Sequence, residues 1–146
     1  MINKNIGFIG CGKMASAIIN GITKSNFISK NNIIASKSCS DNLKEISKTL
    51  GIKIFLDNKK VAEFGNIIFL AVKPVQVKAV LEEIKNYVTK EKILVSVAAG
   101  VKTDFIESIL TKAKVVRVMP NTPVLVNEGM AGICSGKYVK ENDLKT

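Results

Sequence analysis

Residues 5–17 carry the strongest structural signal in the chain and read Asn5-Ile6-Gly7-Phe8-Ile9-Gly10-Cys11-Gly12-Lys13-Met14-Ala15-Ser16-Ala17. A short apolar run, Gly-x-Gly-x-x-Ala and a helical pattern follow one another, which predicts a buried strand, a tight turn and a helix. Gly10 permits the turn, Gly12 lets a pyrophosphate approach the backbone, and Ala15 lets the helix pack on the strand. The N–H groups and dipole at the start of that helix would face the phosphates. The stretch therefore favours a dinucleotide site over an ordinary glycine turn.

The composition of the chain restricts its class. Its 146 residues are 47% hydrophobic, which suits one compact domain with a core. No apolar run approaches the length of a membrane span, and the first strand begins too early to leave room for a signal peptide. Cys11, Cys39 and Cys134 form neither a CxxC pair nor a disulfide framework, so we expect a cytoplasmic protein. The chain has no histidine, which excludes histidine-assisted nucleophiles and histidine metal ligands within it.

The net charge of +10 raises the question of a nucleic-acid partner. Arg117 is the only arginine, the lysines are spread along the chain, and the aromatic content of 5% offers few rings for base stacking. We therefore expect a solvated basic surface that suits an anionic cofactor, without a nucleic-acid or membrane partner.

Apolar runs predict strands over residues 6–9, 33–36, 52–56, 67–72, 93–97 and 115–119, with residues 130–134 as one more. Helical patterns follow Gly12, Asn42, Asp57, Pro74 and Lys102, with Asp41 expected in the first turn of the second helix and Gly51 at its end. Strands that alternate with helices predict a doubly wound, mostly parallel Rossmann-type α/β sheet with helices on both faces. We expect this domain to cover residues 1–136, and residues 137–146 to begin a linker or helix.

The end of the second strand bears on the choice of cofactor. NAD-binding folds usually place an acidic residue there to bind the ribose 2′-hydroxyl, whereas this chain has Ser36-Lys37-Ser38. A lysine and hydroxyl groups would accept a 2′-phosphate that a carboxylate would repel. The sequence therefore favours NADP(H) over NAD(H), although Lys37 could also be one of many surface lysines.

Three further positions allow two interpretations each. Small residues at positions 98–100 could let the backbone approach a flat ring or could form a plain turn. Lys73 could stabilise developing charge, but we favour a side chain in solvent and a cofactor role for its backbone. Arg117 lies among apolar neighbours and is expected to be an ion-paired structural residue rather than a substrate clamp.

Several separated segments together resemble the N-terminal domain of the pyrroline-5-carboxylate reductases. They are Gly7-Phe8-Ile9-Gly10-Cys11-Gly12-Lys13-Met14, Ala71-Val72-Lys73-Pro74, Ser96-Val97-Ala98-Ala99-Gly100-Val101, Val116-Arg117-Val118-Met119-Pro120-Asn121-Thr122-Pro123 and Glu128-Gly129. The segments occur in the order of the family and cover almost the whole chain. The resemblance implies hydride transfer from NAD(P)H to the C=N bond of 1-pyrroline-5-carboxylate, which gives proline and needs no metal.

The resemblance also implies a role for each matching position. The pyrophosphate would be held by Ile9, Gly10, Cys11, Gly12, Lys13 and Met14, although Met14 alone would be read as a core residue. The adenosine ribose and its 2′-phosphate would meet Ser36 and Lys37, and Asn58 corresponds to an asparagine that the family uses at the cofactor. The cofactor crevice would be lined by Ala71, Val72, Lys73 and Pro74. Near the nicotinamide end of the cofactor would lie Val97, Ala98 and Ala99, and the nicotinamide pocket would be shaped by Asn121 and Pro123.

The resemblance has one departure. Family members continue into a helical C-terminal domain that forms dimers and supplies most of the substrate site, so a homo-oligomer is expected of the full-length form and no catalytic acid is assigned here. Two other functions remain open. One is a stand-alone NADP(H)-binding module without catalysis, and the other is the cofactor domain of a hydroxyacid or prephenate-type dehydrogenase.

Overall fold

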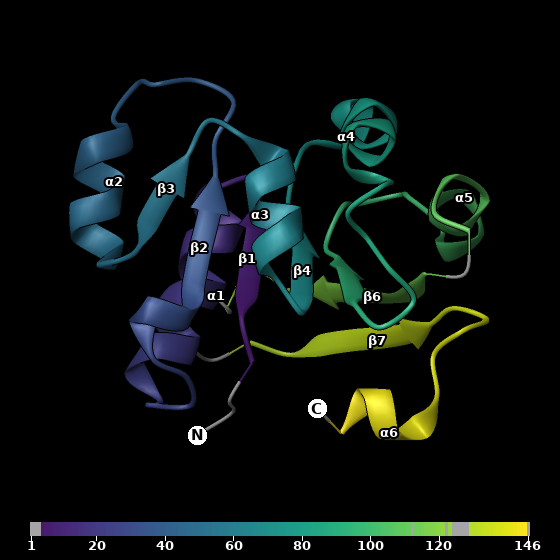
Figure 1. Cartoon of the computed structure of the whole chain (residues 1–146). Helices are drawn as coiled ribbons and strands as arrows, with labels where there is room; N and C mark the ends of the chain where they lie inside the picture. Colours follow the sequence, from purple (N-terminus) through teal and green to yellow (C-terminus); the bar gives the residue numbers. More distant parts are fainter. Residues whose placement is uncertain (1–3, 112, 122, 124–128, 146) are drawn as a thin grey trace.

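The computed structural model describes residues 4–111, 113–121, 123 and 129–145, and its strands form one sheet (Figure 1). The order across the sheet is β3-β2-β1-β4-β5-β6-β7. The strands are β1 (Ile6–Ile9), β2 (Ile33–Ser36), β3 (Lys53–Phe55), β4 (Ile67–Leu70), β5 (Ile93–Ser96), β6 (Lys114–Pro120) and β7 (Ala131–Ser135).

Neighbouring strands from β3 across to β6 are parallel, and β7 pairs with β6 in the antiparallel direction. The chain builds β1, β2 and β3 outward in one direction, then returns to the other side of β1 for β4, β5 and β6. This reversal between β1 and β4 confirms the predicted doubly wound fold and creates the crevice in which such sheets bind ligands.

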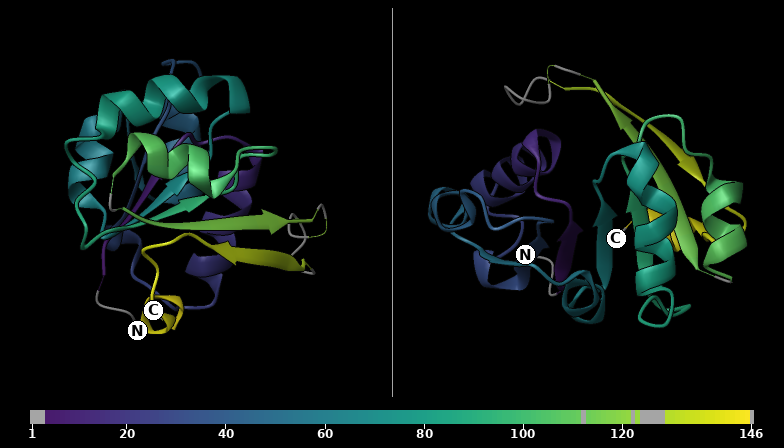
Figure 2. Two further views of the ribbon diagram at one scale, coloured as in Figure 1. Left: turned by 90° about the vertical axis from the view of Figure 1, so that its right-hand side faces the viewer. Right: turned by 90° about the horizontal axis from the view of Figure 1, so that it is seen from above.

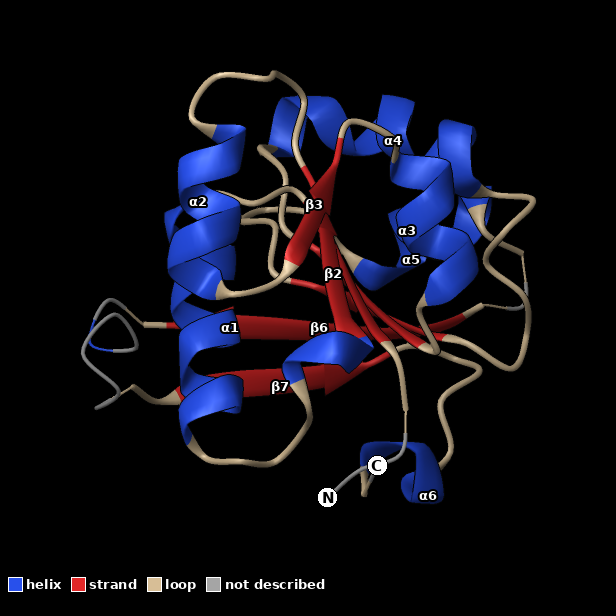
Figure 3. Ribbon diagram, turned by 60° about the vertical axis from the view of Figure 1, so that its left-hand side comes forward, coloured by secondary structure: helices blue, strands red, loops and turns tan. Residues whose placement is uncertain are grey.

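The helices lie in two layers (Figure 3). On one face α1 (Lys13–Lys24) and α2 (Leu43–Leu50) pack against β1, β2 and β3. On the other face lie α3 (Asn58–Phe64), α4 (Val77–Ile84) and α5 (Thr103–Ile109). Two single turns of 3₁₀ helix, η1 (Lys30–Asn32) and η2 (Pro74–Gln76), precede β2 and α4.

Continuous apolar runs place the central strands in the core. Every residue of β1 and β2 is buried, as expected of parallel strands with both faces covered. Phe8 of β1 lies opposite Phe69 of β4, and their rings stack with centroids 4.6 Å apart. The middle of the sheet is thus fixed by side chains that the sequence places in register.

Several predicted boundaries were wrong by one or two residues. β4 ends at Leu70 and β5 at Ser96, earlier than expected, because residues after them turn away to form loops at the carboxyl edge of the sheet. β3 is shorter than expected, and β6 is longer at both ends. Asp41 was also misplaced, since α2 begins at Leu43 after Asn42, whose positive φ of 54° sets it outside the helix.

The last described segment crosses to the side of the sheet opposite α4 and α5. In the left view of Figure 2, α4 and α5 lie above the sheet, and α6 (Glu141–Leu144) lies below it. The predicted break between residues 136 and 137 falls between β7 and α6, and the two-part division remains a prediction. Within the described part of the chain, none of the helices combines the length and apolarity that crossing a membrane would require.

Candidate functional site

The loop between β1 and α1 depends on Gly10. Its φ is +91°, a conformation that L-residues rarely adopt. A Cβ atom at this position would also lie only 2.6 Å from the carbonyl oxygen of Ala71, in the loop after β4. Gly10 therefore allows the first turn to pass directly against the second half of the sheet.

Gly12 has a different role in the same loop. Its backbone is extended, with φ −91° and ψ −170°, and it caps the start of α1. A Cβ atom at Gly12 would meet no atom within 4 Å, so the space beside it is open. The first N–H groups of a helix have no partner within the helix and carry partial positive charge, which suits a phosphate in that space.

A cleft of about 260 Å³ opens at this point, along the carboxyl ends of the strands on both sides of the switch between β1 and β4. Its lining combines small residues of the loops with two lysines and a few polar and apolar side chains. The lining residues are Gly10, Cys11, Gly12, Lys37, Ser38, Leu56, Asn58, Ala71, Val72, Lys73, Gln76 and Val80.

Asn58 is held in this cleft by two hydrogen bonds. The hydroxyl of Ser36, which is fully buried at the end of β2, donates to Asn58 Oδ1 over 2.6 Å. Asn58 Nδ2 donates to Glu83 Oε2 of α4 over 2.8 Å. Ser36 is thus positioned to orient Asn58, and the Asn58 amide retains one N–H that these bonds do not use.

Lys37 and Ser38 follow Ser36 at the rim of the cleft. The backbone N–H of Lys37 donates to the carbonyl of Phe55 in β3 over 2.9 Å, and its ammonium donates to the carbonyl of Asp41. Lys37 is half-buried and Ser38 is exposed. Lys37 thus lines the rim of the cleft, and its ammonium is bound by the Asp41 carbonyl rather than by a carboxylate.

Cys11 lies between the cleft and the core, and it is 5% exposed. Burial raises the pKa of the Cys11 thiol above its usual range, and a hydrogen bond with Ser16 and the positive charge of Lys37 oppose this effect less strongly. The thiol is therefore neutral near pH 7, and it adds no negative charge where a phosphate would bind.

The remaining residues that were predicted to bind the cofactor differ in how exposed they are. Ile9 is fully buried, Ala98 is nearly so, and Met14 and Val97 are half-buried. Lys13, Lys73, Pro74, Ala99 and Pro123 are exposed, and Lys73 lines the cleft as the preceding Ala71 and Val72 do. Thr122 and Glu128, which belong to the matching segments, lie outside the described residues.

Asn121 and Arg117 have partners that the sequence did not indicate. Asn121 Oδ1 accepts a hydrogen bond from the backbone N–H of Met130 over 2.9 Å, and so helps to close the β6–β7 pair. The Arg117 guanidinium donates to the sulfur of Met119 over 3.3 Å. The prediction of an ion pair for Arg117 was wrong among the described residues. None of their carboxylate oxygens lies within 4.0 Å of a guanidinium nitrogen of Arg117.

Sequence reasoning missed four residues of the cleft and its support: Leu56, Gln76, Val80 and Glu83. Leu56 is the last residue of a predicted strand, so its position at the carboxyl edge of the sheet could have identified it. Glu83 lies on an exposed helix surface 25 residues after Asn58, and no local signal connects the two. Among the described residues, no three histidine, cysteine or acidic side chains gather in a way that could hold a metal ion.

The chain matches the family described as "NADP oxidoreductase coenzyme F420-dependent" over residues 5–100. It is 41% identical to the pyrroline-5-carboxylate reductase of Methanosarcina acetivorans, a match that covers 99% of this chain and 54% of the relative. The chain spans about half the length of the curated relatives it matches.

Solved structures are similar over the same part. The pyrroline-5-carboxylate reductase of Coxiella burnetii superposes with a TM-score of 0.92 at 35% identity, covering 99% of this chain and 54% of that one. The Plasmodium falciparum pyrroline carboxylate reductase with NADP bound has a TM-score of 0.86 at 36% identity, covering 99% and 53%. A prephenate dehydrogenase of A. aeolicus, at 15% identity and a TM-score of 0.83 over 99% and 55%, shares the fold alone.

Proposed function

The chain belongs to the family described as NADP oxidoreductase coenzyme F420-dependent, and from this premise we propose that it is the NADP(H)-binding part of a pyrroline-5-carboxylate reductase. The observation that carries the proposal is the cleft at the switch between β1 and β4, where Gly12 leaves open space before a helix N-terminus and Lys37 lines the rim. The names of the relatives supply the substrate.

The described residues fit such a cofactor. A side chain at Gly12 would fill the space that a pyrophosphate needs, and the first turn of α1 would donate N–H groups to it. Lys37 and Ser38 would face a 2′-phosphate at the adenosine end, with Asn58 held beside them by Ser36 and Glu83. Charge-assisted hydrogen bonds of this kind favour NADP(H) over NAD(H).

When bound, the nicotinamide would supply a hydride to the carbon of the substrate C=N bond, while the nitrogen takes a proton and becomes the secondary amine of proline. The residues of this chain would position the cofactor. Ala71, Val72 and Lys73 would form one wall of the crevice, and the small residues 97–99 would let the ring lie close to the backbone. We assign no proton donor to this chain.

The second candidate is a stand-alone NADP(H)-binding module without catalysis, which the same cleft supports equally, since its lining bears on cofactor binding and not on turnover. The alternative function, that of a prephenate-type dehydrogenase, is supported only by the similarity of the fold. We also place the protein in the cytoplasm, a proposal supported by its three free cysteines.

Titration calorimetry of the chain with NADPH and NADH tests the cofactor, and an assay with NADPH and 1-pyrroline-5-carboxylate tests the reaction. We expect binding with a preference for NADPH. Binding without turnover would support the separate-module candidate for these 146 residues, whereas full activity would contradict the view that the substrate site lies elsewhere. Undetectable binding of both nucleotides would refute the cofactor assignment itself.

A further inference from the structure

Asn58 is the middle member of a hydrogen-bonded chain of three side chains, and of the three it alone lines the cleft. Ser36 is fully buried at the end of β2, and Glu83 lies on the exposed side of α4. A ligand in the cleft would therefore meet the Asn58 amide, while the other two side chains act on that ligand only through Asn58.

The orientation of this amide decides what the cleft offers to a ligand. An asparagine amide carries an oxygen that only accepts hydrogen bonds and a nitrogen that only donates them, and the two ends have nearly the same size. Half a turn about the Cβ–Cγ bond exchanges their positions without changing the shape of the side chain. A ligand atom placed to accept a hydrogen bond from Asn58 Nδ2 would then meet a carbonyl oxygen instead.

Ser36 does not determine the orientation of the amide. Its hydroxyl lies 2.6 Å from Asn58 Oδ1 and donates to that oxygen. A hydroxyl group can also accept a hydrogen bond, so after half a turn of the amide the same Ser36 oxygen would accept from Nδ2. Ser36 therefore satisfies either orientation.

Glu83 does determine it. Its carboxylate accepts a hydrogen bond from Asn58 Nδ2 over 2.8 Å, and a carboxylate has no hydrogen to donate. After half a turn of the amide, two acceptor oxygens would face each other in place of a charge-assisted hydrogen bond. In the described part of the chain, no lysine or arginine nitrogen lies within 4.0 Å of the Glu83 carboxylate, so no ion pair competes with Asn58 for it.

We propose that Glu83 is a positioning residue for the cofactor: it fixes the Asn58 amide so that the second N–H of Nδ2 is available to a phosphate oxygen at the adenosine end of the cleft. This inference rests on the proposed function. Phosphate oxygens only accept hydrogen bonds, so they bind an N–H and are repelled by a carbonyl oxygen. Lys37 and Ser38 line the same cleft and offer further donors.

The charge of Glu83 and its positioning role affect an anionic cofactor in opposite directions, which makes the proposal testable with Glu83→Lys. An ammonium at position 83 would attract phosphate, but it can only donate and would turn the Asn58 oxygen toward itself. The matched control is Glu82→Lys, which changes the net charge equally one residue earlier on α4, where the carboxylate pairs with Lys85. The conservative variant is Glu83→Gln, whose amide oxygen still accepts from Nδ2.

Calorimetric titration with NADPH measures the outcome. We expect Glu83→Lys to lower NADPH affinity by about five-fold or more despite its added positive charge, and Glu82→Lys to leave the affinity unchanged or raise it. Glu83→Gln should lose at most about two-fold, the loss when both amide orientations are equally populated. Unchanged or tighter NADPH binding by Glu83→Lys overturns the proposal, because charge alone would then explain the effect of this position.

Nuclear Overhauser effects report the orientation of the amide without any nucleotide. In the unsubstituted chain, the side-chain NH₂ protons of Asn58 should show their stronger effect to the Glu83 Hγ protons, and in Glu83→Lys to the Ser36 Hβ protons. An unchanged pattern in Glu83→Lys overturns the proposal. Urea unfolding should give similar stabilities for all variants, since Glu83 is exposed. Undetectable NADPH binding by the unsubstituted chain would instead refute the proposed function, and the cofactor role of Glu83 with it.

Discussion

The hydroxyl of Ser36 donates a 2.6 Å hydrogen bond to Asn58 Oδ1, and this bond joins the end of β2 to the first residue of α3 beside the cleft. Ser36 is fully buried, whereas Asn58 reaches the cleft. The bond from Ser36 therefore holds in place the Asn58 side chain, which would touch the cofactor. Glu83 accepts a second hydrogen bond from the same amide, through Asn58 Nδ2.

Replacing Ser36 with alanine should weaken both the fold and nucleotide binding. The substitution leaves the part-buried Asn58 oxygen without its donor, which costs about 1–2 kcal/mol of unfolding free energy. Urea unfolding measures this loss, and calorimetry should show weaker NADPH binding in the folded protein. Ser38→Ala is the control, since Ser38 is exposed at the same rim, and its unfolding free energy should stay near that of the unsubstituted chain. Unchanged NADPH affinity in Ser36→Ala would remove the positioning role.

Gly12 and Gly10 should respond differently to substitution. Gly12→Asn adds a side chain to open space at an N-cap position, where asparagine is favoured, so stability should be unchanged or raised by a few tenths of a kcal/mol. The same side chain would fill the proposed phosphate site and lower NADPH affinity by about ten-fold or more. Comparable NADPH affinity in Gly12→Asn would argue against a phosphate beside this residue.

Gly10→Ala is the matched substitution in the same loop. Its positive φ and the close Ala71 carbonyl predict a loss of unfolding free energy of about 1–2 kcal/mol or more. Urea denaturation of both variants measures their unfolding free energies and shows whether only Gly10→Ala loses stability. A stability loss for Gly12→Asn equal to that for Gly10→Ala would contradict the difference in packing.

Lys37 should determine the preference between the two nucleotides. Lys37→Glu replaces the cation at the cleft rim with a carboxylate, which would repel a 2′-phosphate but leave a 2′-hydroxyl largely unaffected. Calorimetric titrations should show a larger loss of affinity for NADPH than for NADH. The control is Lys90→Glu, an exposed position outside the cleft with the same change in net charge. Equal losses for the two nucleotides would refute the role of Lys37.

Local sequence patterns were sufficient for the elements that build the cleft. The apolar run at β1, the glycines and the helix after them lie within one continuous segment, so their geometry follows from neighbouring residues. The Ser36–Asn58–Glu83 contacts join residues 22 and 25 positions apart, and only the packing of α3 and α4 on the sheet brings them together. Such contacts depend on tertiary structure and leave no spacing pattern to read.

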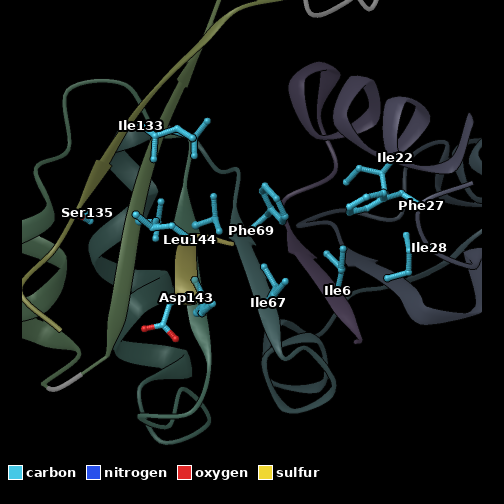
Figure 4. A pocket seen from close by; sticks show the side chains of 14 residues that line it. Ile6, Ile22, Phe27, Ile28, Ile67, Phe69, Ile133, Ser135, Asp143 and Leu144 are labelled. Atoms are coloured by element: carbon cyan, nitrogen blue, oxygen red, sulfur yellow. The ribbon is translucent and has the colours of Figure 1, made fainter. Parts of the chain in front are cut away.

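An apolar groove on one face of β4, β5 and β6, where Ile67 and Phe69 form part of its floor, shows a second limit of local patterns (Figure 4). The apolar runs at β4 and β5 indicated correctly that these strands are central. No pattern within a strand specifies which of its faces the helices cover, so this groove emerged only from the positions of α1 and α2 over β1, β2 and β3.

The three cysteines should differ in reactivity. The pKa of the Cys11 thiol is raised by burial, so less reactive thiolate is present near pH 7 than at an ordinary cysteine, while Cys39 and Cys134 are exposed. Alkylation followed by peptide mass spectrometry should show rapid modification of Cys39 and Cys134 and slow modification of Cys11. Urea should abolish the difference, which serves as the control. Rapid alkylation of Cys11 in the native chain would contradict its burial.

The contact between α6 and β6 should depend on pH. The hydrogen bond from Lys114, then that from the Lys140 backbone, lowers the pKa of the Asp143 carboxyl below its usual value. A carboxyl whose pKa is lower in the folded state stabilises that state above its unfolded pKa of about 4, and this stabilisation is lost as the pH falls through the folded pKa. The thermal midpoint of Asp143→Ala should therefore lie below that of the unsubstituted chain at neutral pH, with the difference shrinking from about pH 5 downward.

Glu141→Ala is the control, because its partner Lys145 is 67% exposed and such exposed ion pairs contribute little to stability. A difference for Asp143→Ala that persists unchanged in acid would show that the side chain acts there through packing rather than through its charge.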